Sequence, residues 1–425
     1  MKCAVLFTTI QAISAFAPPM PRSSHPPAPR RTSSIAYDNA SKDNYSRIDL
    51  WRKRCNLPPL ASLPSSTQED ETNNKPIYTF GVLTDIQHAP IPDGHSYSGN
   101  ARYYRHAIKA AEEAAKHFQE ERVQCVVNLG DIIDGKCTDI EKHGGEIDDE
   151  KKMNGCSVGH DVIDDVLKVL SHYDFGKILH TYGNHELYNL SRQDLAEKLS
   201  IPFKLEPTGD LVGYYDHLLH EPQQPSSSDM KVRFIMLDSY DICLLDRCPE
   251  SSHKHQLAHD IMAANNPNYP EEENSPEGLE GLARRFVAFN GGVDVPQLSW
   301  FEQSLQTARE NNEKVIVCSH QPIHPDSTFP TCLVWNYDEI LAMLRKYSDV
   351  VMASFSGHAH KGGYCRDEVS GVHFRTFEAV LESPDPIRTY AFVEVFENRL
   401  VVSGWGDCVS DVYDLDHLRI GMESK

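Results

Sequence analysis

Five short apolar segments of this chain each lead into residues that bind metals or act as acids and bases. The segments span residues 77–83, 125–129, 177–181, 315–318 and 350–355. The motifs that follow them are DIQ from Asp85, GDIIDG from Gly130, GNHE from Gly183, SHQP from Ser319 and GHAH from Gly357. Short apolar runs predict buried strands, and ligands of open α/β sheets gather at the carboxyl ends of strands. We therefore expect the five loops to converge on one site.

The rest of the chain predicts helices that alternate with strands. Apolar residues at helical spacing indicate helices over residues 102–121, 161–170, 296–309 and 337–344. Further strands are expected at residues 232–237, 372–376, 390–395 and 400–403. Such alternation favours α/β layers in which helices cover sheets. The polar segment 139–160 interrupts this pattern, and we interpret it as a surface insert.

Two His-x-His pairs occur in the chain, and their surroundings differ. His358 and His360 follow the apolar run VVMASF, so a strand leads directly to them. Residues i and i+2 of a strand point to the same side, which can aim two imidazoles at one point. His253 and His255 lie instead in the polar run SSHKHQ. We interpret the second pair as part of a solvated loop.

The N-terminal segment differs in charge from the rest of the chain. Residues 1–37 contain four basic residues and no acidic one, and the apolar run in residues 4–17 follows a single early lysine. This pattern predicts a targeting presequence over residues 1–40, followed by a polar linker over 41–75. The SAFAP junction at residues 14–18 resembles the bipartite presequences of algae with complex plastids. A plastid destination is therefore expected, with an ordinary secretory signal as the alternative.

The charge of the whole chain restricts its partners. The 425 residues carry a formal net charge of -21, which argues against binding of nucleic acid phosphates. An acidic protein can still bind a phosphorylated ligand if metal ions supply the local positive charge. No apolar stretch of transmembrane length follows the first twenty residues. We expect a monomer that acts on small molecules, without nucleic acid or membrane partners.

The ordered set of motifs resembles the calcineurin-like metallophosphoesterases. With glutamine at position 87 of the DIQ motif, the chain resembles one branch, the manganese-dependent ADP-ribose/CDP-alcohol diphosphatases. Most other members of the superfamily have histidine at this position. The form GHAHKGGY, with Lys361, resembles the plant-type members. The resemblance implies an α/β fold in which two mixed β-sheets pack face to face and helices flank them, a four-layer α/β/β/α sandwich. The catalytic domain is expected over residues 76–410, with residues 411–425 as a C-terminal tail.

The resemblance also implies a pair of divalent metal ions, Mn²⁺ above all. Asp131 is the natural bridge, because one carboxylate can reach two metals. By resemblance, one metal is completed by Asp85, Gln87 and His360, and the other by Asn184, His320 and His358. Oxygen and imidazole ligands without thiolate suit Mn, Fe or Zn and do not choose between them.

The chemistry implied by such a site is hydrolysis of a pyrophosphate bond. Two metals can hold a bridging hydroxide for in-line attack on phosphorus and offset the charge that develops. His185 is outside the metal set and fits a general acid or electrostatic partner of the leaving oxygen, with Asp134 orienting its ring. Glu186 is interpreted as structural, paired with a nearby cation. The expected substrates are ADP-ribose and CDP-alcohols such as CDP-choline and CDP-glycerol.

Substrate recognition has weaker signals than metal binding. A nucleotide ligand needs a slot for its base and hydrogen-bonding groups for its sugar. The candidates for these contacts are Arg102, Tyr103, Tyr104, Asn290, Gly291, Gly292, Cys332 and Trp335. Core packing is the alternative for the three aromatic residues, and the glycines can equally mark a turn.

Other activities with the same metal core stay open as alternatives. They are a phosphomonoesterase, including a protein phosphatase, a cyclic-nucleotide phosphodiesterase, and a non-catalytic scaffold. The protein phosphatases usually carry an arginine after the GDxxD element, where this chain has Gly135 and Lys136. A purple acid phosphatase would need a tyrosine where Ile132 and Ile133 stand. A scaffold would be expected to lose ligands, and the motifs here keep all of them.

Overall fold

The computed structural model describes residues 75–96, 99–146, 158–206, 208–219, 230–245 and 251–420. The presequence expected over residues 1–40 and all but the last residue of the linker expected over 41–75 lie outside the described residues. Half of the insert expected over 139–160, residues 147–157, also lies outside them.

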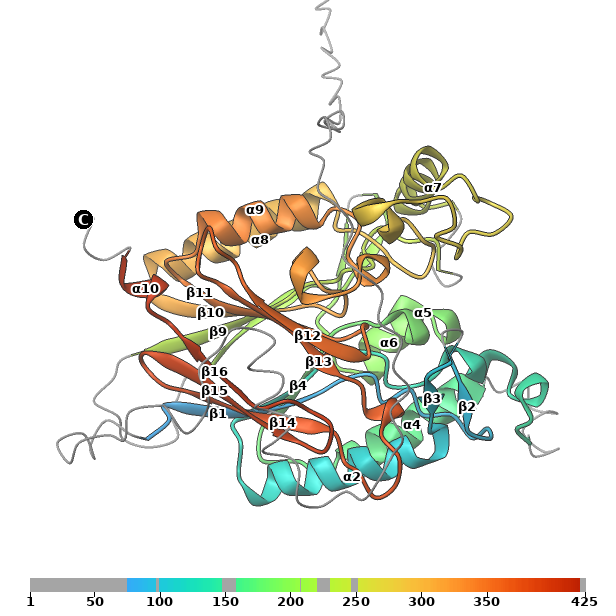
Figure 1. Cartoon of the computed structure of the whole chain (residues 1–425), viewed down its shortest axis with the longest axis horizontal. Helices are drawn as coiled ribbons and strands as arrows, with labels where there is room; N and C mark the ends of the chain where they lie inside the picture. The colour runs from blue at the N-terminus through green and yellow to red at the C-terminus, as the bar shows by residue number, and fades with distance from the viewer. Residues whose placement is uncertain are drawn as a thin grey trace, which may run out of the picture. The chain divides into compact units, whose positions relative to one another are not determined.

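Two six-stranded sheets make up the centre of the described structure (Figure 1). The first sheet contains, in spatial order, β16 (Asp411–Asp414), β15 (Arg399–Trp405), β14 (Tyr390–Val395), β1 (Tyr78–Leu83), β4 (Cys125–Asn128) and β5 (Lys177–His180). Strands β1, β4 and β5 run parallel, and the C-terminal strands continue the sheet antiparallel from β14. The first sheet is therefore mixed.

The second sheet is also mixed, with a parallel centre and antiparallel edges. In spatial order it contains β12 (Lys361–Arg366), β13 (His373–Glu378), β11 (Val351–Ser356), β10 (Glu313–Cys318), β9 (Lys231–Met236) and β8 (Tyr215–Leu219). Its four central strands are parallel, and β12 and β8 pair antiparallel at the two edges. The central strands of both sheets read as continuous apolar runs because both of their faces are covered.

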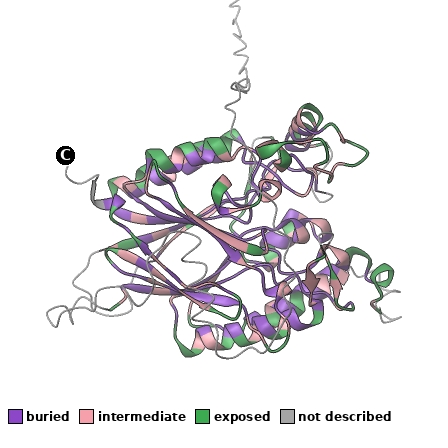
Figure 2. Ribbon diagram, in the orientation of Figure 1, coloured by how far each residue is buried: buried purple, intermediate pink, exposed green. Residues whose placement is uncertain are grey.

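Helices cover the outer face of each sheet, as Figure 1 shows. On the first sheet lie α2 (Tyr104–Glu120) and α4 (Val158–Leu170); on the second lie α8 (Val295–Glu310) and α9 (Tyr337–Lys346). Phe80, Phe234 and Phe355 belong to the apolar core between the sheets. In Figure 2 the strands are buried along most of their length, whereas the outer sides of α8 and α9 are exposed. The expected four-layer α/β/β/α sandwich is confirmed.

The helix α2 shows how its sequence sets the packing. Its buried face is mostly alanine and ends at Phe118, which allows close approach to the first sheet. A Cβ atom on Gly81 of β1 would lie 2.7 Å from the Phe118 ring. Glycine at this position therefore lets the ring lie directly on the strand.

The remaining elements are short helices and ribbons that connect the strands and the covering helices or follow the last strand. The helices are α5 (Asn184–Asn189), α6 (Arg192–Lys198), α7 (His253–Asn265) and α10 (His417–Ile420). The 3₁₀ helices are η2 (Gly135–Asp139), η3 (Glu141–His143), η4 (Gly281–Arg285), η5 (Pro325–Ser327), η6 (Pro330–Cys332) and η7 (Val380–Glu382). Two small ribbons pair β2 (Gly94–His95) with β3 (Ala101–Arg102) and β6 (Lys204–Leu205) with β7 (Leu211–Val212). Among the described residues, no helix has the length and apolar character to cross a membrane.

Two interpretations of the sequence are corrected by this fold. The segment from residue 411, expected as a tail, contains β16, which pairs with β15, and the short helix α10. The run SSHKHQ, expected as a solvated loop, forms the start of α7, in which Lys254 and His255 are buried. Ser252 caps this helix by accepting a hydrogen bond from the His255 amide. Strands β8 and β12 were not expected either.

Candidate metal centre

The strand-end loops hold several of their candidate ligands in an unusual backbone conformation. Asp85, Gln87, Asp131 and His358 all have positive φ angles, of 51°, 42°, 57° and 66°. Residues other than glycine rarely adopt this conformation, and it is concentrated at functional sites, where the surrounding structure enforces it. The tight turns aim all four side chains back over the strand ends.

The glycines in two of the motifs let these loops approach one another. A Cβ atom on Gly183 would lie 2.1 Å from the Asp131 carboxylate, and one on Gly357 would lie 2.0 Å from the Thr84 hydroxyl. No side chain fits at either position. The glycines of GNHE and GHAH are therefore required by the closeness of neighbouring loops.

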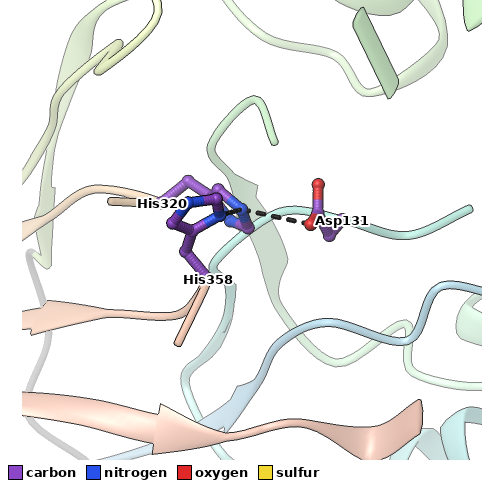
Figure 3. A group of neighbouring side chains, drawn as sticks. All are labelled: Asp131, His320 and His358. Carbon is purple, nitrogen blue, oxygen red and sulfur yellow. Dashed lines mark hydrogen bonds and ion pairs between the residues drawn. The ribbon is translucent and has the colours of Figure 1, made fainter. Parts of the chain in front are cut away.

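Asp131, His320 and His358 meet at the carboxyl ends of β4, β10 and β11 (Figure 3). Their potential ligand atoms all lie within 4.8 Å of one another. His320 Nε2 is 3.2 Å from Asp131 Oδ2, and His358 Nδ1 is 3.2 Å from His320 Nε2. In Figure 3 the two imidazole rings and the carboxylate point toward one another.

The outer hydrogen bonds of the two histidines fix where their protons lie. His320 Nδ1 donates to the Leu129 carbonyl at 2.6 Å, and His358 Nε2 faces Asn290 Oδ1 at 2.9 Å. When the rings are neutral, His320 Nε2 and His358 Nδ1 both present lone pairs to the centre, beside the Asp131 carboxylate. Three converging electron-pair donors need a cation between them, so these residues fit a divalent metal ion.

The second half of the centre gathers around His360 and Asp85. His360 Nε2 lies 3.3 Å from Asp85 Oδ1, and its Nδ1 is 3.0 Å from Glu382 Oε1. The carboxylate of Glu382 therefore accepts the Nδ1 proton and leaves Nε2 for a metal. Lys361 pairs with the same carboxylate from the solvent side.

Gln87 enters this half of the centre through its amide nitrogen. Its Nε2 is 3.0 Å from Asp131 Oδ2 and 2.9 Å from His360 Nε2. Its carbonyl oxygen, the atom that could bind a metal, accepts a hydrogen bond from Arg102 at 3.3 Å. A bond from Gln87 to a metal therefore requires its amide group to turn round.

Asn184 begins α5 and is held by a tyrosine from the turn that follows β9 of the second sheet. Its Oδ1 accepts a hydrogen bond from the Tyr240 hydroxyl at 3.1 Å. Burial raises the pKa of Tyr240 well above its usual value, so this hydroxyl stays a donor. Tyr240 lies in LDSYD, a stretch that the sequence analysis did not assign to the site.

The charges of the centre favour cations. Burial lowers the pKa of His320, but the Asp131 carboxylate outweighs it and raises the pKa to about 9. Burial also lowers the pKa of His360, and the Asp85 and Glu382 carboxylates raise it to about 9. Burial and the neighbouring His320 lower the pKa of His358 to about 3. Protons and metal ions therefore compete for the same positions.

Glu186 has the structural role that was expected, but it pairs with backbone amides instead of a cation. Its carboxylate accepts hydrogen bonds from the backbone amides of Asp131, Ile132 and Gly183. Burial, followed by the charge of Asp131, raises the pKa of Glu186 to about 8. Glu186 therefore joins the GD and GN loops from below the site.

His185 lies at the edge of the metal-binding residues, and both Gly135 and Asp134 contact its ring. His185 Nδ1 accepts a hydrogen bond from the Gly135 amide at 2.7 Å, while Asp134 Oδ2 lies 3.4 Å from the same nitrogen. Asp134 Oδ1 instead caps η2 by accepting from the Lys136 amide at 2.9 Å. Asp134 therefore contacts the His185 ring through Oδ2 and holds the turn that carries Gly135 through Oδ1, and its orienting role stays a prediction.

The structure buries some of the substrate-binding candidates and leaves the others partly exposed. Tyr104 and Trp335 are buried in apolar clusters, and Asn290 and Gly291 are buried with their polar groups in hydrogen bonds. These four are unavailable to a ligand, which corrects their assignment. Gly292 is buried and exchanges backbone hydrogen bonds with Ile242, as a turn glycine would.

Three candidates keep partial exposure, namely Arg102, Tyr103 and Cys332. Arg102 is close to the centre, with Nη1 3.6 Å from Asp134 Oδ2. Cys332 is near enough to Asp85 for that charge to add to the effect of burial, and its pKa is raised to about 12. The Cys332 thiol is therefore uncharged at neutral pH.

Two residues that position ligands, Glu382 and Tyr240, had no assigned role in the sequence analysis. Glu382 lies in the run VLESP, which resembles an ordinary loop and has no metal-binding motif. Glu382 could have been found from the chemistry of metal-bound histidines, but not from the residues next to it in the sequence. A metal-bound histidine usually donates its other ring proton to a carboxylate or carbonyl, so such a partner has to exist somewhere in the chain.

Comparisons with known proteins agree with this geometry. The sequence model of the calcineurin-like phosphoesterases matches residues 78–362. The chain is 38% identical to a manganese-dependent ADP-ribose/CDP-alcohol diphosphatase of Oryza sativa subsp. japonica, over 78% of this chain and 92% of the relative. A protein of the same name from Bos taurus is 37% identical over 78% of this chain and 92% of that protein.

A solved structure supports the same relationship. A dimetal phosphatase from Danio rerio is 31% identical and superimposes with a TM-score of 0.67, covering 80% of this chain and all of that one. The chain thus belongs to the calcineurin-like phosphoesterases and, within them, to the family of the manganese-dependent ADP-ribose/CDP-alcohol diphosphatases.

Proposed function

We propose that this protein is a metal-dependent hydrolase that cleaves the pyrophosphate bond of ADP-ribose and CDP-alcohols. The products are a nucleoside monophosphate and a phosphorylated sugar or alcohol. The observation that carries the proposal is the convergence of His320 Nε2, His358 Nδ1 and the Asp131 carboxylate on one point. The substrate class comes from the names of the relatives, which match most of their own length.

The candidate ligands of this chain fit a pair of divalent metal ions. Two divalent ions, Mn²⁺ above all, activate water and offset the charge of the phosphoryl group when they are bound. The expected ligands are Asp85, Asp131, Asn184, His320, His358 and His360, with Gln87 joining if its amide turns. Asp85, Asp131, Asn184 and His320 are buried, whereas His358 and His360 are partly exposed. The buried ligands limit the access of bulk water to the reacting group, which strengthens the charge interactions there.

His185 is the residue of this chain that can donate a proton to the substrate. Because its Nδ1 accepts the Gly135 amide proton, a neutral ring carries its own proton on Nε2. That atom lies 3.9 Å from Asp131 Oδ2 and so faces the centre. A donor there can stabilise a phosphoryl oxygen or the leaving oxygen.

Arg102 offers a second contact for a phosphate of the substrate. Its side chain is 20% exposed, and it reaches from β3 toward Gln87 and Asp134. A guanidinium at the rim can bind a phosphate oxygen with two donors. The net charge of -21 makes such local positive charge necessary for an anionic ligand and supports small nucleotides over nucleic acid as substrates. Action as a monomer and a plastid destination remain predictions from the sequence.

The test compares product formation from ADP-ribose, CDP-choline and p-nitrophenyl phosphate, each with Mn²⁺, Mg²⁺ or a chelator. We expect Mn²⁺-dependent cleavage of the two diphosphates and little turnover of the monoester. His185→Ala is expected to lower kcat by about 100-fold without changing the number of bound Mn²⁺ ions. His172→Ala, at a half-exposed histidine close to Glu112 on the outer layer, is the matched control and should leave kcat unchanged.

Two outcomes would overturn parts of the proposal. Strong monoester turnover with the diphosphates intact would leave a phosphomonoesterase and remove the substrate assignment. Equal kcat values for His185→Ala and the wild type would remove the role of the Nε2 proton.

A further inference from the structure

Asn290 uses every polar atom of its side chain within the protein. It is fully buried, and its amide nitrogen donates to the carbonyls of Arg285 and Thr331, both at 2.8 Å, and of Leu333 at 3.4 Å. Its oxygen faces His358 Nε2 at 2.9 Å. Turning the amide round would set the oxygen against the same carbonyls, so its orientation is fixed by the backbone.

This orientation decides which nitrogen of His358 can bind a metal. The oxygen of Asn290 only accepts hydrogen bonds, so His358 Nε2 must carry the ring proton. The lone pair is then left on Nδ1, which lies 3.2 Å from His320 Nε2 in the centre. The backbone carbonyls that hold the Asn290 amide thus determine which nitrogen of His358 is free to bind a metal.

The same amide also holds a loop beside the site. Thr331 and Leu333 flank Cys332 at the end of η6, and both of their carbonyls accept from Asn290. Cys332 is partly exposed and feels the charge of Asp85. Phe329, just before this helix, is 55% exposed. The segment 329–333 therefore runs from backbone carbonyls held by the Asn290 amide to a ring that is exposed to solvent.

We propose that Asn290 is a positioning residue that couples the metal ligand His358 to the substrate-side loop 329–333. Its oxygen sets the tautomer of His358, and its nitrogen sets the position of the loop. Metal binding and substrate affinity are therefore linked through one side chain. The inference rests on the proposed function, because it concerns the same metal centre.

Asn266 provides a matched control within the chain. It is also a buried asparagine whose amide nitrogen donates to three backbone carbonyls, those of Glu273, Ser275 and Phe286. Its oxygen accepts from the Asn268 amide at 2.9 Å rather than from a histidine. Asn266→Ala therefore removes the same kind of backbone bridge without touching a candidate ligand.

The experiment measures Mn²⁺ binding, kinetics and thermal unfolding for Asn290→Ala, Asn290→Asp and Asn266→Ala. Free Mn²⁺ is followed by its EPR signal during titration, so the readout does not depend on activity. We expect Asn290→Ala to lower the affinity for one of the two Mn²⁺ ions by roughly 10- to 100-fold and also to raise KM for ADP-ribose. Asn266→Ala should keep both Mn²⁺ affinities and KM, even if its midpoint of unfolding falls as much.

Asn290→Asp separates the two roles of the side chain. A carboxyl oxygen can still accept the His358 proton, whereas the second oxygen cannot bridge three carbonyls. We expect Mn²⁺ affinity within about threefold of the wild type, together with the raised KM of Asn290→Ala.

The outcomes separate this inference from the proposed function. If the wild type binds two Mn²⁺ ions and cleaves ADP-ribose, but Asn290→Ala binds both ions as tightly, the coupling role is wrong. It is also wrong if Asn290→Asp loses Mn²⁺ as Asn290→Ala does, because the acceptor is then not what matters. A wild-type protein that binds no Mn²⁺ would instead contradict the proposed function.

Discussion

At the scale of single residues, the site is decided by which ring nitrogen carries each proton. His320 donates from Nδ1 to a backbone carbonyl, His360 donates from Nδ1 to Glu382, and His358 donates from Nε2 to Asn290. The motifs predicted which residue types would meet at the strand ends. They could not predict the tautomers, because the partners come from segments without a metal-binding motif.

The protonation of these histidines predicts how metal binding depends on pH. The pKa values of His320 and His360 are raised to about 9, so both rings hold protons below that pH in the metal-free protein. Mn²⁺ must displace them, and this competition disappears as pH rises through 9. We expect the apparent Mn²⁺ affinity to increase from pH 6 to pH 9, by about tenfold per pH unit for each displaced proton.

Calorimetric titration with Mn²⁺ in buffers of different ionisation enthalpy measures the released protons directly. At pH 7 we expect proton release on Mn²⁺ binding. The same titration at pH 10 should show almost none. An affinity that stays level between pH 6 and pH 9 would contradict the assignment of these two rings as ligands.

At the scale of elements, α7 shows how partners distant in sequence override a local pattern. The polar run SSHKHQ predicts a solvated loop, yet Lys254 lies 7% exposed on the inner side of a helix. Asp241, Glu206 and Asp294 surround its ammonium group. These carboxylates come from three other segments, so no window of sequence around Lys254 reveals them. Ser252, a residue type that favours helix N-caps, directly precedes the helix and caps it.

The buried position of Lys254 predicts a large loss of stability when its charge is removed. Lys254→Met leaves the buried Asp241 carboxylate without its cation and should lower the free energy of unfolding by about 3–5 kcal/mol. Lys346→Met is the matched control, because Lys346 and its partner Glu302 are both exposed. It should leave the free energy of unfolding close to that of the wild type, because solvent screens an exposed ion pair. Unfolding in urea measures both, and equal losses would contradict the structural role of Lys254.

At the scale of the whole molecule, the layers could be predicted and the end of the domain could not. Apolar runs and helical spacing indicated the central strands and the covering helices, and the motif order implied how they stack. The segment DVYD at residues 411–414 is short and bounded by acidic residues, so it does not resemble a strand. It becomes one because β15 offers a free edge and the Tyr413 ring stacks on Tyr364 and His373 of the second sheet.

This packing predicts that residues 411–420 are needed for folding. Tyr413, Leu415 and Leu418 belong to the core between the sheets, and burying each side chain contributes about 1.5–3 kcal/mol. A chain that ends at residue 410 should therefore be insoluble or unfold at a much lower temperature. A chain that ends at residue 420 should match the full chain in thermal unfolding. Equal midpoints of thermal unfolding for the two truncated chains would show that residues 411–420 are a dispensable tail.

The pairing of β1 with β14 has a consequence for how the protein is made. Tyr78 lies opposite Val395, so one edge of an early strand is closed by residues synthesised roughly 300 positions later. At roughly 5–20 residues per second, a ribosome delivers that partner on the order of half a minute after β1 has emerged. Until then the nascent chain carries an open apolar strand edge that another chain could occupy. The sheet that positions Asp85 is thus completed only after β14 has been synthesised.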